Sequence, residues 1–216
     1  MTTLREQLDR RRRELRATMD PTTRTVLEMA LKRLEMLQIK EHALALGDPL
    51  PDLALPDTSG AIVSSEALLA RGPLVLSFFR GGWCPYCDLA LRAMERARPA
   101  FEATGASLVA ITPEAPAMLA ATARAKVLTF TLLSDPGSAY AKLCGLHFEL
   151  TDAQVAFYTG RGLDLPARHA GSGWELPVPA TYLVGRDGIV AWAFVNPDWT
   201  RRAEPDAILA ALQALG

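Results

Sequence analysis

Apolar positions in the first forty residues follow a helical period. Leucines recur at helical spacing within residues 3–17 and again within 21–40, which predicts two amphipathic helices. Asp20-Pro21 between them offers an N-cap and a proline for the first helical turn. Because their apolar face would otherwise be exposed, we expect these helices to pack on the rest of the chain or across a homodimer interface.

The pattern changes at Gly47–Pro51, where two prolines prevent a helix from continuing. We therefore expect a helical N-terminal extension over 1–46 and a second unit over 47–216. In that unit short apolar runs alternate with helical patterns. Strands are expected near 53–55, 61–63, 73–79, 107–112, 128–133, 180–184 and 189–195, and helices up to about 98 and over 114–126, 137–143 and 203–215.

This order of elements predicts an α/β fold with a mixed central sheet flanked by helices. Strands that alternate with helices indicate parallel crossovers, while Asp187-Gly188 is typical of the positive φ angles in a tight antiparallel hairpin. Residues 151–174 contain four glycines, so we expect an insertion loop with some helix there.

Composition excludes several classes of protein. Half of the 216 residues are hydrophobic and 22% are charged, as in a globular chain. With 23 basic and 24 acidic side chains there is no field to attract nucleic acid. The N-terminus lacks the apolar stretch of a signal peptide and no run approaches the length of a membrane span, so we expect a cytoplasmic protein with no membrane partner.

The candidate chemistry lies in Cys84-Pro85-Tyr86-Cys87, between an expected buried strand and an expected helix. A thiolate at a helix N-terminus is stabilised by the positive end of the helix dipole, which lowers its pKa below the usual value of about 8.5. Cys84 is therefore the expected nucleophile and the more acidic thiol. Cys87, one helical turn further on, can attack a sulfur bonded to Cys84 and form a disulfide.

Other readings of this motif stay open. A zinc site would need two further Cys or His ligands at comparable spacing, and each remaining candidate stands alone in the sequence. Inert packing is the third possibility. We favour redox chemistry, expect no cofactor, and expect Cys144 to be a small buried hydrophobic residue.

Residues 77–87, Ser-Phe-Phe-Arg-Gly-Gly-Trp-Cys-Pro-Tyr-Cys, resemble the active site of the thioredoxin superfamily. Segments 47–57, 133–137 and 196–205 resemble its peroxiredoxin-like branch, the alkyl hydroperoxide reductase and thiol-specific antioxidant family, in a bacterial subgroup with a Cys-Pro-Tyr-Cys motif. The resemblance covers about residues 45–212. It implies a thioredoxin-like fold, a hydroperoxide substrate and a thioredoxin-type reductant.

The resemblance also implies site residues. Val178-Pro179 matches a cis-proline that faces the active cysteine, with a trans edge-strand proline as the alternative, and Trp83 and Pro179 are the implied substrate-binding residues. The family has a proline seven residues before its peroxidatic cysteine and a threonine three before it. Counted from Cys84, these positions are Ser77 and Gly81.

The family's transition-state arginine has two candidates in this sequence, Arg80 and Arg202. We expect both to form surface salt bridges instead. Three functions remain: a thiol peroxidase in which Cys84 attacks and Cys87 resolves, a thiol-disulfide oxidoreductase acting on protein disulfides, and a non-catalytic interaction module. The flanking segments favour the first, while the motif core and the missing threonine favour the second.

Overall fold

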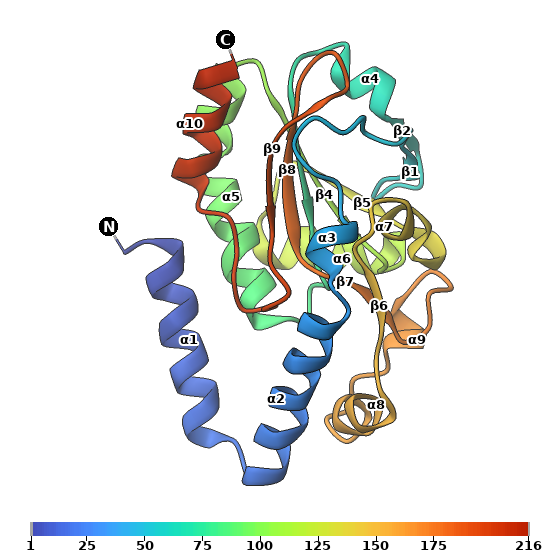
Figure 1. Ribbon diagram of the computed structural model, residues 1–216. Helices are drawn as coiled ribbons and strands as arrows, with labels where there is room; N and C mark the ends of the chain where they lie inside the picture. Colours follow the sequence, from blue (N-terminus) through green and yellow to red (C-terminus); the bar gives the residue numbers. More distant parts are fainter. Residues whose placement is uncertain (1, 216) are drawn as a thin grey trace.

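A five-stranded mixed sheet forms the centre of the computed structural model, which describes residues 2–215 (Figure 1). The strand order is β5-β4-β3-β8-β9, with β3, β4 and β5 parallel and β8 and β9 antiparallel to their neighbours. The strands are β3 (Leu74–Phe78), β4 (Ser107–Thr112), β5 (Thr131–Ser134), β8 (Ala180–Val184) and β9 (Val190–Val195). The expected mixed sheet is confirmed.

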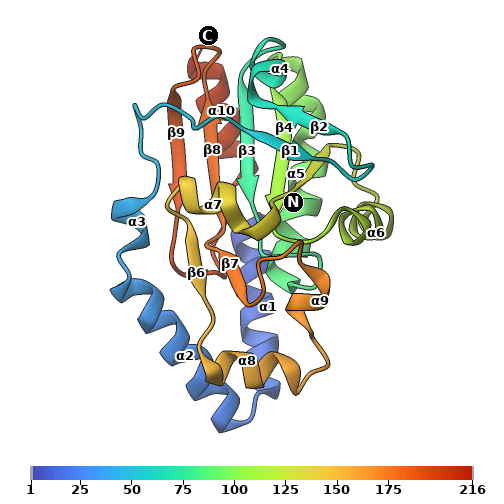
Figure 2. The same ribbon diagram turned by 90° about the vertical axis from the view of Figure 1, so that its right-hand side faces the viewer.

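Both faces of the sheet are covered, so its strands consist almost entirely of apolar residues. Val75 packs into the core on one face, while Leu74 and Leu76 pack into the core on the other. Helices α5 (Pro85–Ala103) and α10 (Pro205–Leu215) cover the first face. Helix α7 (Ala139–Leu143) and the hairpin of β1 (Ala54–Pro56) and β2 (Ile62–Ser64) cover the second (Figure 2).

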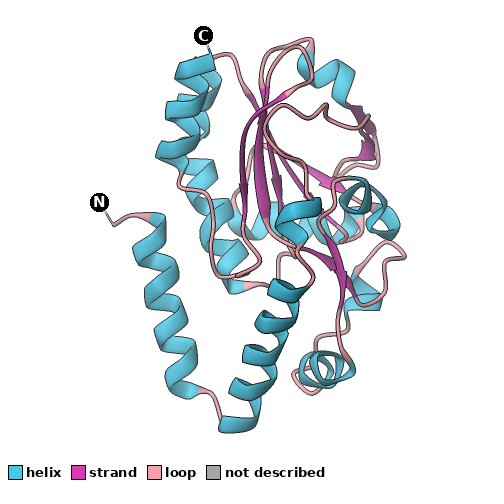
Figure 3. Cartoon of the chain, viewed as in Figure 1, coloured by secondary structure: helices cyan, strands magenta, loops and turns pink. Residues whose placement is uncertain are grey.

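The remaining elements lie around these layers (Figure 3). They are α3 (Ile39–His42), α4 (Ser65–Leu69), α6 (Pro116–Lys126), a 3-10 turn (Pro136–Ser138), β6 (His147–Glu149), α8 (Asp152–Thr159), α9 (Leu165–Arg168) and β7 (Glu175–Pro177). Strands β6 and β7 pair with each other and were not predicted, because three residues are too few to show a period. Of the helices that residues 2–215 form, none is both long and apolar enough to cross a membrane.

The hairpin between β8 and β9 is antiparallel, as predicted, but its turn differs from the expectation. Only Gly188 has a positive φ, of 78°, so Asp187-Gly188 does not supply two left-handed residues. The Asp187 carboxylate instead accepts a hydrogen bond from the backbone N–H of Ile189, and the strand register shifts at Leu183 and Val184.

Helices α1 (Leu4–Thr18) and α2 (Pro21–Met36) form the N-terminal hairpin. Asp20 caps α2 by accepting a hydrogen bond from the N–H of Thr23 at 2.9 Å, as the sequence predicts. The expected helix over 21–40 is interrupted at Gln38, whose φ of 49° ends α2 before α3 begins.

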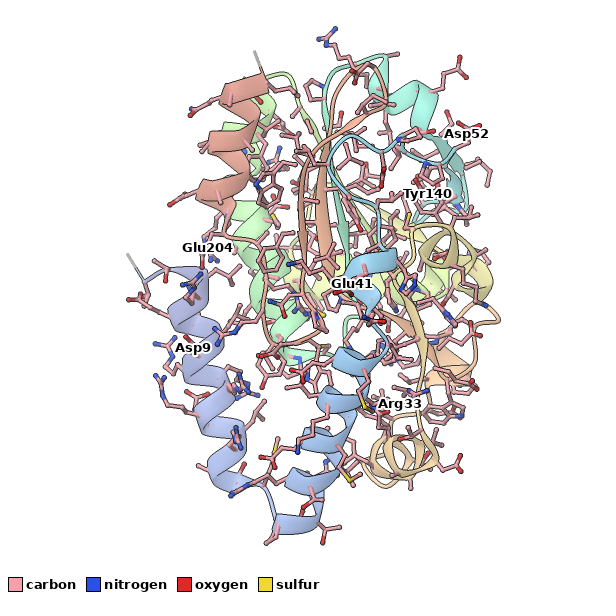
Figure 4. The ribbon with its side chains drawn as sticks, in the orientation of Figure 1. Asp9, Arg33, Glu41, Asp52, Tyr140 and Glu204 are labelled. Atoms are coloured by element: carbon pink, nitrogen blue, oxygen red, sulfur yellow. The ribbon has the colours of Figure 1, made fainter. Side chains whose placement is uncertain are left out.

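The hairpin packs on the rest of the same chain, which confirms one of the two expected arrangements. Leu4 and Leu8 are each 3% exposed and belong to the same hydrophobic cluster as α5 and α10. The Glu204 carboxylate accepts hydrogen bonds from the first backbone N–H groups of α1, and Figure 4 shows it beside the start of that helix. On the other side, Arg33 donates to the carbonyl of Glu149 at 2.7 Å.

We predict that Leu8→Ala lowers the free energy of unfolding by about 2–5 kcal/mol, because it leaves a cavity between α1 and α5. Met29→Ala is the control: Met29 lies on α2 but is 67% exposed, so its loss should change stability by less than about 0.5 kcal/mol. Urea unfolding followed by circular dichroism measures both. Equal midpoints for Leu8→Ala and the unmodified chain would show that α1 contributes nothing to the core.

Candidate active site

The turn from β3 into α5 positions the two predicted cysteines. Cys84 is the N-cap residue of α5, and Pro85 occupies the first helical position, where its missing N–H leaves no hydrogen bond unmade. Cys87 lies in the first turn of the helix. Both side chains are buried, Cys84 at 1% and Cys87 at 0% exposed, and they are close enough to hydrogen bond. The structure thus brings together the pair that the sequence singled out.

Two glycines allow the loop before Cys84 to approach its surroundings closely. A Cβ at Gly82 would lie 2.1 Å from the hydroxyl oxygen of Thr122, and Gly81 has a φ of 147° that favours glycine. A Cβ at Gly81 would also lie 2.3 Å from the indole nitrogen of Trp83. No side chain fits at position 81, so no hydroxyl can stand three residues before Cys84.

A buried carboxylate holds this loop. Glu114, 0% exposed, accepts a hydrogen bond from the backbone N–H of Gly82 at 2.7 Å and another from Nε of Arg168 at 2.9 Å. The carboxylate is thus compensated by a cation and a backbone donor, as a buried charge requires. Because β4 leads to Glu114 and α9 carries Arg168, these two elements fix the loop that precedes the thiol pair.

The thiol pair is polarised by Arg202, whose Nη2 lies 3.1 Å from the sulfur of Cys87. The same guanidinium donates through Nη1 to the carbonyls of Trp199 and Arg201, which fixes its position. Burial opposes ionisation of Cys87, but its hydrogen bond with Cys84 and the charge of Arg202 outweigh burial, so the pKa of Cys87 lies well below that of an ordinary thiol.

The pKa of Cys84 is shifted in the opposite direction. The hydrogen bond that its thiol donates to Cys87, followed by burial, raises the pKa of Cys84 well above the usual value. The prediction that Cys84 is the more acidic thiol is therefore wrong for the reduced pair. The helix N-terminus does favour an anion at Cys84, but the guanidinium of Arg202 contacts Cys87 and not Cys84. The two neighbouring sulfurs therefore share a single negative charge.

Arg80 is buried as well, at 3% exposed. Its guanidinium carbon lies 5.0 Å from the ring centre of Trp83, 5.5 Å from that of Trp199 and 5.8 Å from that of Tyr158, whose hydroxyl accepts one of its hydrogen bonds. Aromatic faces thus take the place of a carboxylate around this cation. The expectation of surface salt bridges is wrong for both Arg80 and Arg202, because within residues 2–215 their partners are rings, a hydroxyl, carbonyls and a thiol.

Pro179 does not have the conformation that the sequence predicts. All peptide bonds of the described residues are trans, including the one between Val178 and Pro179. The chain runs extended from β7 into β8 and makes no turn there: Val178 donates to the carbonyl of Leu146 at 2.7 Å, and Ala180 pairs with Phe78 on β3. A trans bond suits that extended path.

A cavity of about 480 Å³ opens beside the thiol pair. Cys84 lines it and Cys87 does not, so Cys84 is the sulfur that an entering molecule meets. Trp83, one of the implied substrate-binding residues, is also part of the lining, whereas Pro179 is not. The lining comprises Leu15, Thr18, Met19, Leu27, Arg80, Trp83, Cys84, Pro85, Tyr86, Phe157, Tyr158, Arg161, Leu163 and Trp199.

Cys144 lies apart from this site, at the end of α7 on the opposite face of the sheet. It is fully buried, and burial raises the pKa of its thiol to about 12. It is thus packed as a small hydrophobic residue, as predicted. No three His, Cys, Asp or Glu side chains of the described part of the chain gather in a way that could hold a metal ion.

Sequence reasoning missed several contributors to the site. Glu114 and Tyr158 are single residues without a motif, and only the fold brings them to the loop. Trp199 was also missed, although it lies within the segment 196–205 that was noted for its resemblance. Arg202, in the same segment, was named as a candidate arginine but was expected to form a surface salt bridge.

The chain was then compared with known proteins. Residues 46–193 match the model of the AhpC/TSA family. Among solved structures, the chain is similar to peroxidoxin BcpB from Mycobacterium tuberculosis, with a TM-score of 0.63 and 23% identity over 80% of this chain and 99% of that one. It is also similar to peroxiredoxin Q from Xanthomonas campestris, with a TM-score of 0.57 and 21% identity over 75% and 90%.

A third solved structure described as a putative thiol:disulfide interchange protein DsbE, from Chlorobium tepidum, has a TM-score of 0.54 and 22% identity over 79% of this chain and 99% of that one. A comparison with curated proteins finds no match. The likenesses confirm the expected thioredoxin-like fold. With the family model covering 148 of the 216 residues, the chain belongs to the AhpC/TSA family.

Proposed function

We propose that this protein is a thiol-dependent peroxidase that reduces hydroperoxides with Cys84 and Cys87 and is recycled by a thioredoxin-type reductant. One observation carries the proposal: a buried thiol pair with one shared charge, held by Arg202, opens through Cys84 onto a cavity sized for a small molecule. Membership of the AhpC/TSA family supports the same chemistry.

The reduced pair starts as a thiol on Cys84 and a thiolate on Cys87. Transfer of the Cys84 proton to Cys87 leaves a thiolate facing the cavity, which attacks the outer oxygen of the hydroperoxide. The O–O bond breaks as an S–O bond forms, so Cys84 is oxidised to a sulfenic acid and the peroxide is reduced. The departing alkoxide takes the proton from Cys87 and leaves as an alcohol.

The second step, in which Cys87 resolves the sulfenic acid, follows from the closeness of the two sulfurs. Cys87, again a thiolate, attacks the sulfur of Cys84, forms the disulfide and releases hydroxide. Across both steps the pair, with its single proton, converts one hydroperoxide into one alcohol and one hydroxide. Arg202 is a positioning residue in this scheme, because it acts through Cys87: it holds that sulfur in place and stabilises the thiolate that attacks Cys84.

Thiol-disulfide exchange with protein substrates is the second candidate, and the spacing of Cys84 and Cys87 favours it. Against it stands the burial of the pair. An incoming protein disulfide would have to reach Cys84, which is only 1% exposed, whereas a small hydroperoxide fits the cavity that Cys84 lines. The peptide bond before Pro179 is trans, so the site lacks the cis-proline that the resemblance implied for pairing with the backbone of a substrate chain.

A dithiol reductant of the thioredoxin type would return the disulfide to two thiols by exchange. The cytoplasm, predicted from the sequence as the location, supplies such reductants. We expect this step to need local opening of α5, because both sulfurs are buried in the reduced form.

The assignment of the shared charge can be tested by titration. In Cys84→Ser, Cys87 keeps its contact with Arg202, so its thiolate should still form at neutral pH. In Cys87→Ser, Cys84 remains buried and should ionise only at higher pH. Ultraviolet absorbance of the thiolate against pH measures both, and Cys144, whose pKa is about 12, does not interfere. A lower midpoint in Cys87→Ser than in Cys84→Ser would reverse the assignment.

The peroxidase reaction can be tested by trapping. Cys84→Ser should abolish peroxide consumption, whereas Cys87→Ser should react once, more slowly at neutral pH, and stop at a sulfenic acid that dimedone traps on Cys84. Cys144→Ser, the control, should behave as the unmodified protein. If peroxide-treated Cys87→Ser gives no dimedone adduct but traps mixed disulfides with protein substrates, disulfide exchange is the correct function.

A further inference from the structure

The segment that carries Arg202 lies outside the part of the chain that matches the AhpC/TSA family. Arg202 belongs to the stretch between β9 and α10, whereas the match ends at residue 193. The N-terminal hairpin ends at Met36, before the match begins at residue 46. In the folded chain these two parts contact each other (Figure 1). The cation beside the thiol pair is thus held by parts of the chain that the family model does not include.

Arg202 lies in a turn over residues 196–202 that is held together by its own hydrogen bonds. The carboxylate of Asp198 accepts from the backbone N–H of Thr200 at 2.9 Å and from its hydroxyl at 2.7 Å. The guanidinium of Arg202 donates to two backbone carbonyls of the same turn. Because these bonds are local, a contact that shifts the 196–202 turn also shifts Arg202 relative to Cys87.

Helix α1 contacts the 196–202 turn through two ion pairs. Nη1 of Arg12 lies 3.1 Å from the carboxylate of Asp198, and Nη1 of Arg201 lies 3.0 Å from the carboxylate of Asp9. The four side chains are only 19–38% exposed, so solvent screens these pairs less than it would at an open surface. Just beyond the turn, the carboxylate that caps α1 adds two hydrogen bonds to the same helix. The turn is therefore fixed to α1 on both sides of Arg202.

The charges of α1 do not act on the sulfurs directly. Besides the other sulfur, the groups that act most strongly on either cysteine are Arg80 and Arg202. Burial raises the pKa of Tyr86, which lies between the two cysteines in the sequence, so its hydroxyl is neutral at pH 7 and adds no charge. Asp9 and Arg12 are not among these strongest influences. Their route to the thiol pair is therefore through the 196–202 turn.

We propose that Asp9 and Arg12 are positioning residues for the thiol pair. By holding the 196–202 turn, they keep the guanidinium of Arg202 against the sulfur of Cys87. The N-terminal hairpin is then a part of the redox site as well as a cover for the core. This inference rests on the thiol chemistry proposed above and adds the means by which its buried charge is controlled.

The coupling between α1 and the thiol pair is reciprocal, as any coupling of two equilibria is. A thiolate on Cys87 holds Arg202, and through it the 196–202 turn and α1. Formation of the disulfide removes that negative charge, so Arg202 loses its anionic partner and the hold on α1 weakens. Because the hairpin also forms a wall of the cavity that Cys84 lines, oxidation loosens the element that covers the disulfide.

The sign of the shift in pKa distinguishes positioning from direct electrostatics. Removal of a negative charge lowers the pKa of a neighbouring thiol if that charge acts directly. If Asp9 acts by holding the 196–202 turn, Asp9→Asn instead lets Arg202 move away from Cys87 and raises the pKa of that thiol. A change at Asp9 therefore has opposite effects in the two cases.

The test is an ultraviolet titration of Cys87 in Cys84→Ser, in which one thiol of the pair remains. Asp9→Asn in that background should raise the midpoint by roughly half a pH unit, and the further change Arg12→Gln should raise it by roughly one in total. Asp9→Glu should keep most of the original midpoint. Glu14→Gln is the control and should change nothing, because Glu14 pairs with two arginines of its own helix. An unchanged or lower midpoint in Asp9→Asn would overturn the proposal.

Hydrogen exchange measured by mass spectrometry tests the reciprocal effect. The disulfide is formed with diamide, which takes up the two electrons of the pair together with its proton and one proton from water, so no peroxidase activity is needed. Backbone amides of residues 4–18 should exchange roughly threefold faster in the disulfide form than in the reduced form. Asp9→Asn should bring the two forms closer together. Equal exchange in both forms of the unmodified chain would contradict the coupling.

These measurements separate failure of this inference from failure of the peroxidase function. If Asp9→Asn raises the midpoint of Cys87 but the unmodified protein reduces neither hydrogen peroxide nor cumene hydroperoxide, only the peroxidase proposal fails. If the peroxides are reduced and Asp9→Asn leaves the midpoint unchanged, only the role of the hairpin fails.

Discussion

A single negative charge buried between Cys84 and Cys87 sets the requirements for the rest of the site. An isolated thiolate in an apolar interior is costly, so a cation and hydrogen-bond donors have to accompany it. Arg202 provides the direct contact, and Arg80 adds positive charge nearby. Neither arginine has a carboxylate as its nearest partner, so no carboxylate neutralises the positive charge that stabilises the thiolate.

Holding Arg202 requires the segment that joins β9 to α10, and that segment is anchored to the N-terminal hairpin. Asp198 pairs with Arg12, and Arg201 pairs with Asp9. Glu204, labelled in Figure 4 beside the start of α1, accepts hydrogen bonds from the first backbone N–H groups of that helix. The hairpin therefore has two roles. It supports the segment that carries the arginine, and it supplies one wall of the cavity that Cys84 lines.

Much of the fold could be predicted from the sequence because it depends on local signals. Periodicity predicted α1, the central strands and α10, and Asp20-Pro21 correctly marked the start of α2. The pairing of β6 with β7 could not be found in this way, since each strand has three residues and their partners are distant in the chain. Cys84 and Cys87 could be identified because the strand, the turn and the helix N-terminus around them follow one another within one short segment of the sequence.

What the sequence could not predict depends on distant contacts. The acidic thiol was assigned to Cys84 from the helix N-terminus alone, but a guanidinium 115 residues away reaches Cys87 and shifts the charge. The trans bond at Pro179 follows from how β7 runs into β8, which no local signal specifies. Trp83, which the resemblance implied as a substrate-binding residue, lines the cavity beside Cys84. The walls that α1 and α2 contribute could be found only in the folded chain.

The most direct measurement is the pH dependence of the stopped-flow rate at which reduced protein reacts with hydrogen peroxide and an organic hydroperoxide, in the unmodified chain and in Arg202→Gln and Arg202→Lys. A pair whose thiolate is held by Arg202 should react at neutral pH orders of magnitude faster than a free thiol. Arg202→Gln should move the midpoint of the profile to higher pH and Arg202→Lys should restore part of the shift. A profile that Arg202→Gln leaves unchanged, or a rate no faster than that of a free thiol of matched pKa, would contradict the role assigned to this buried charge.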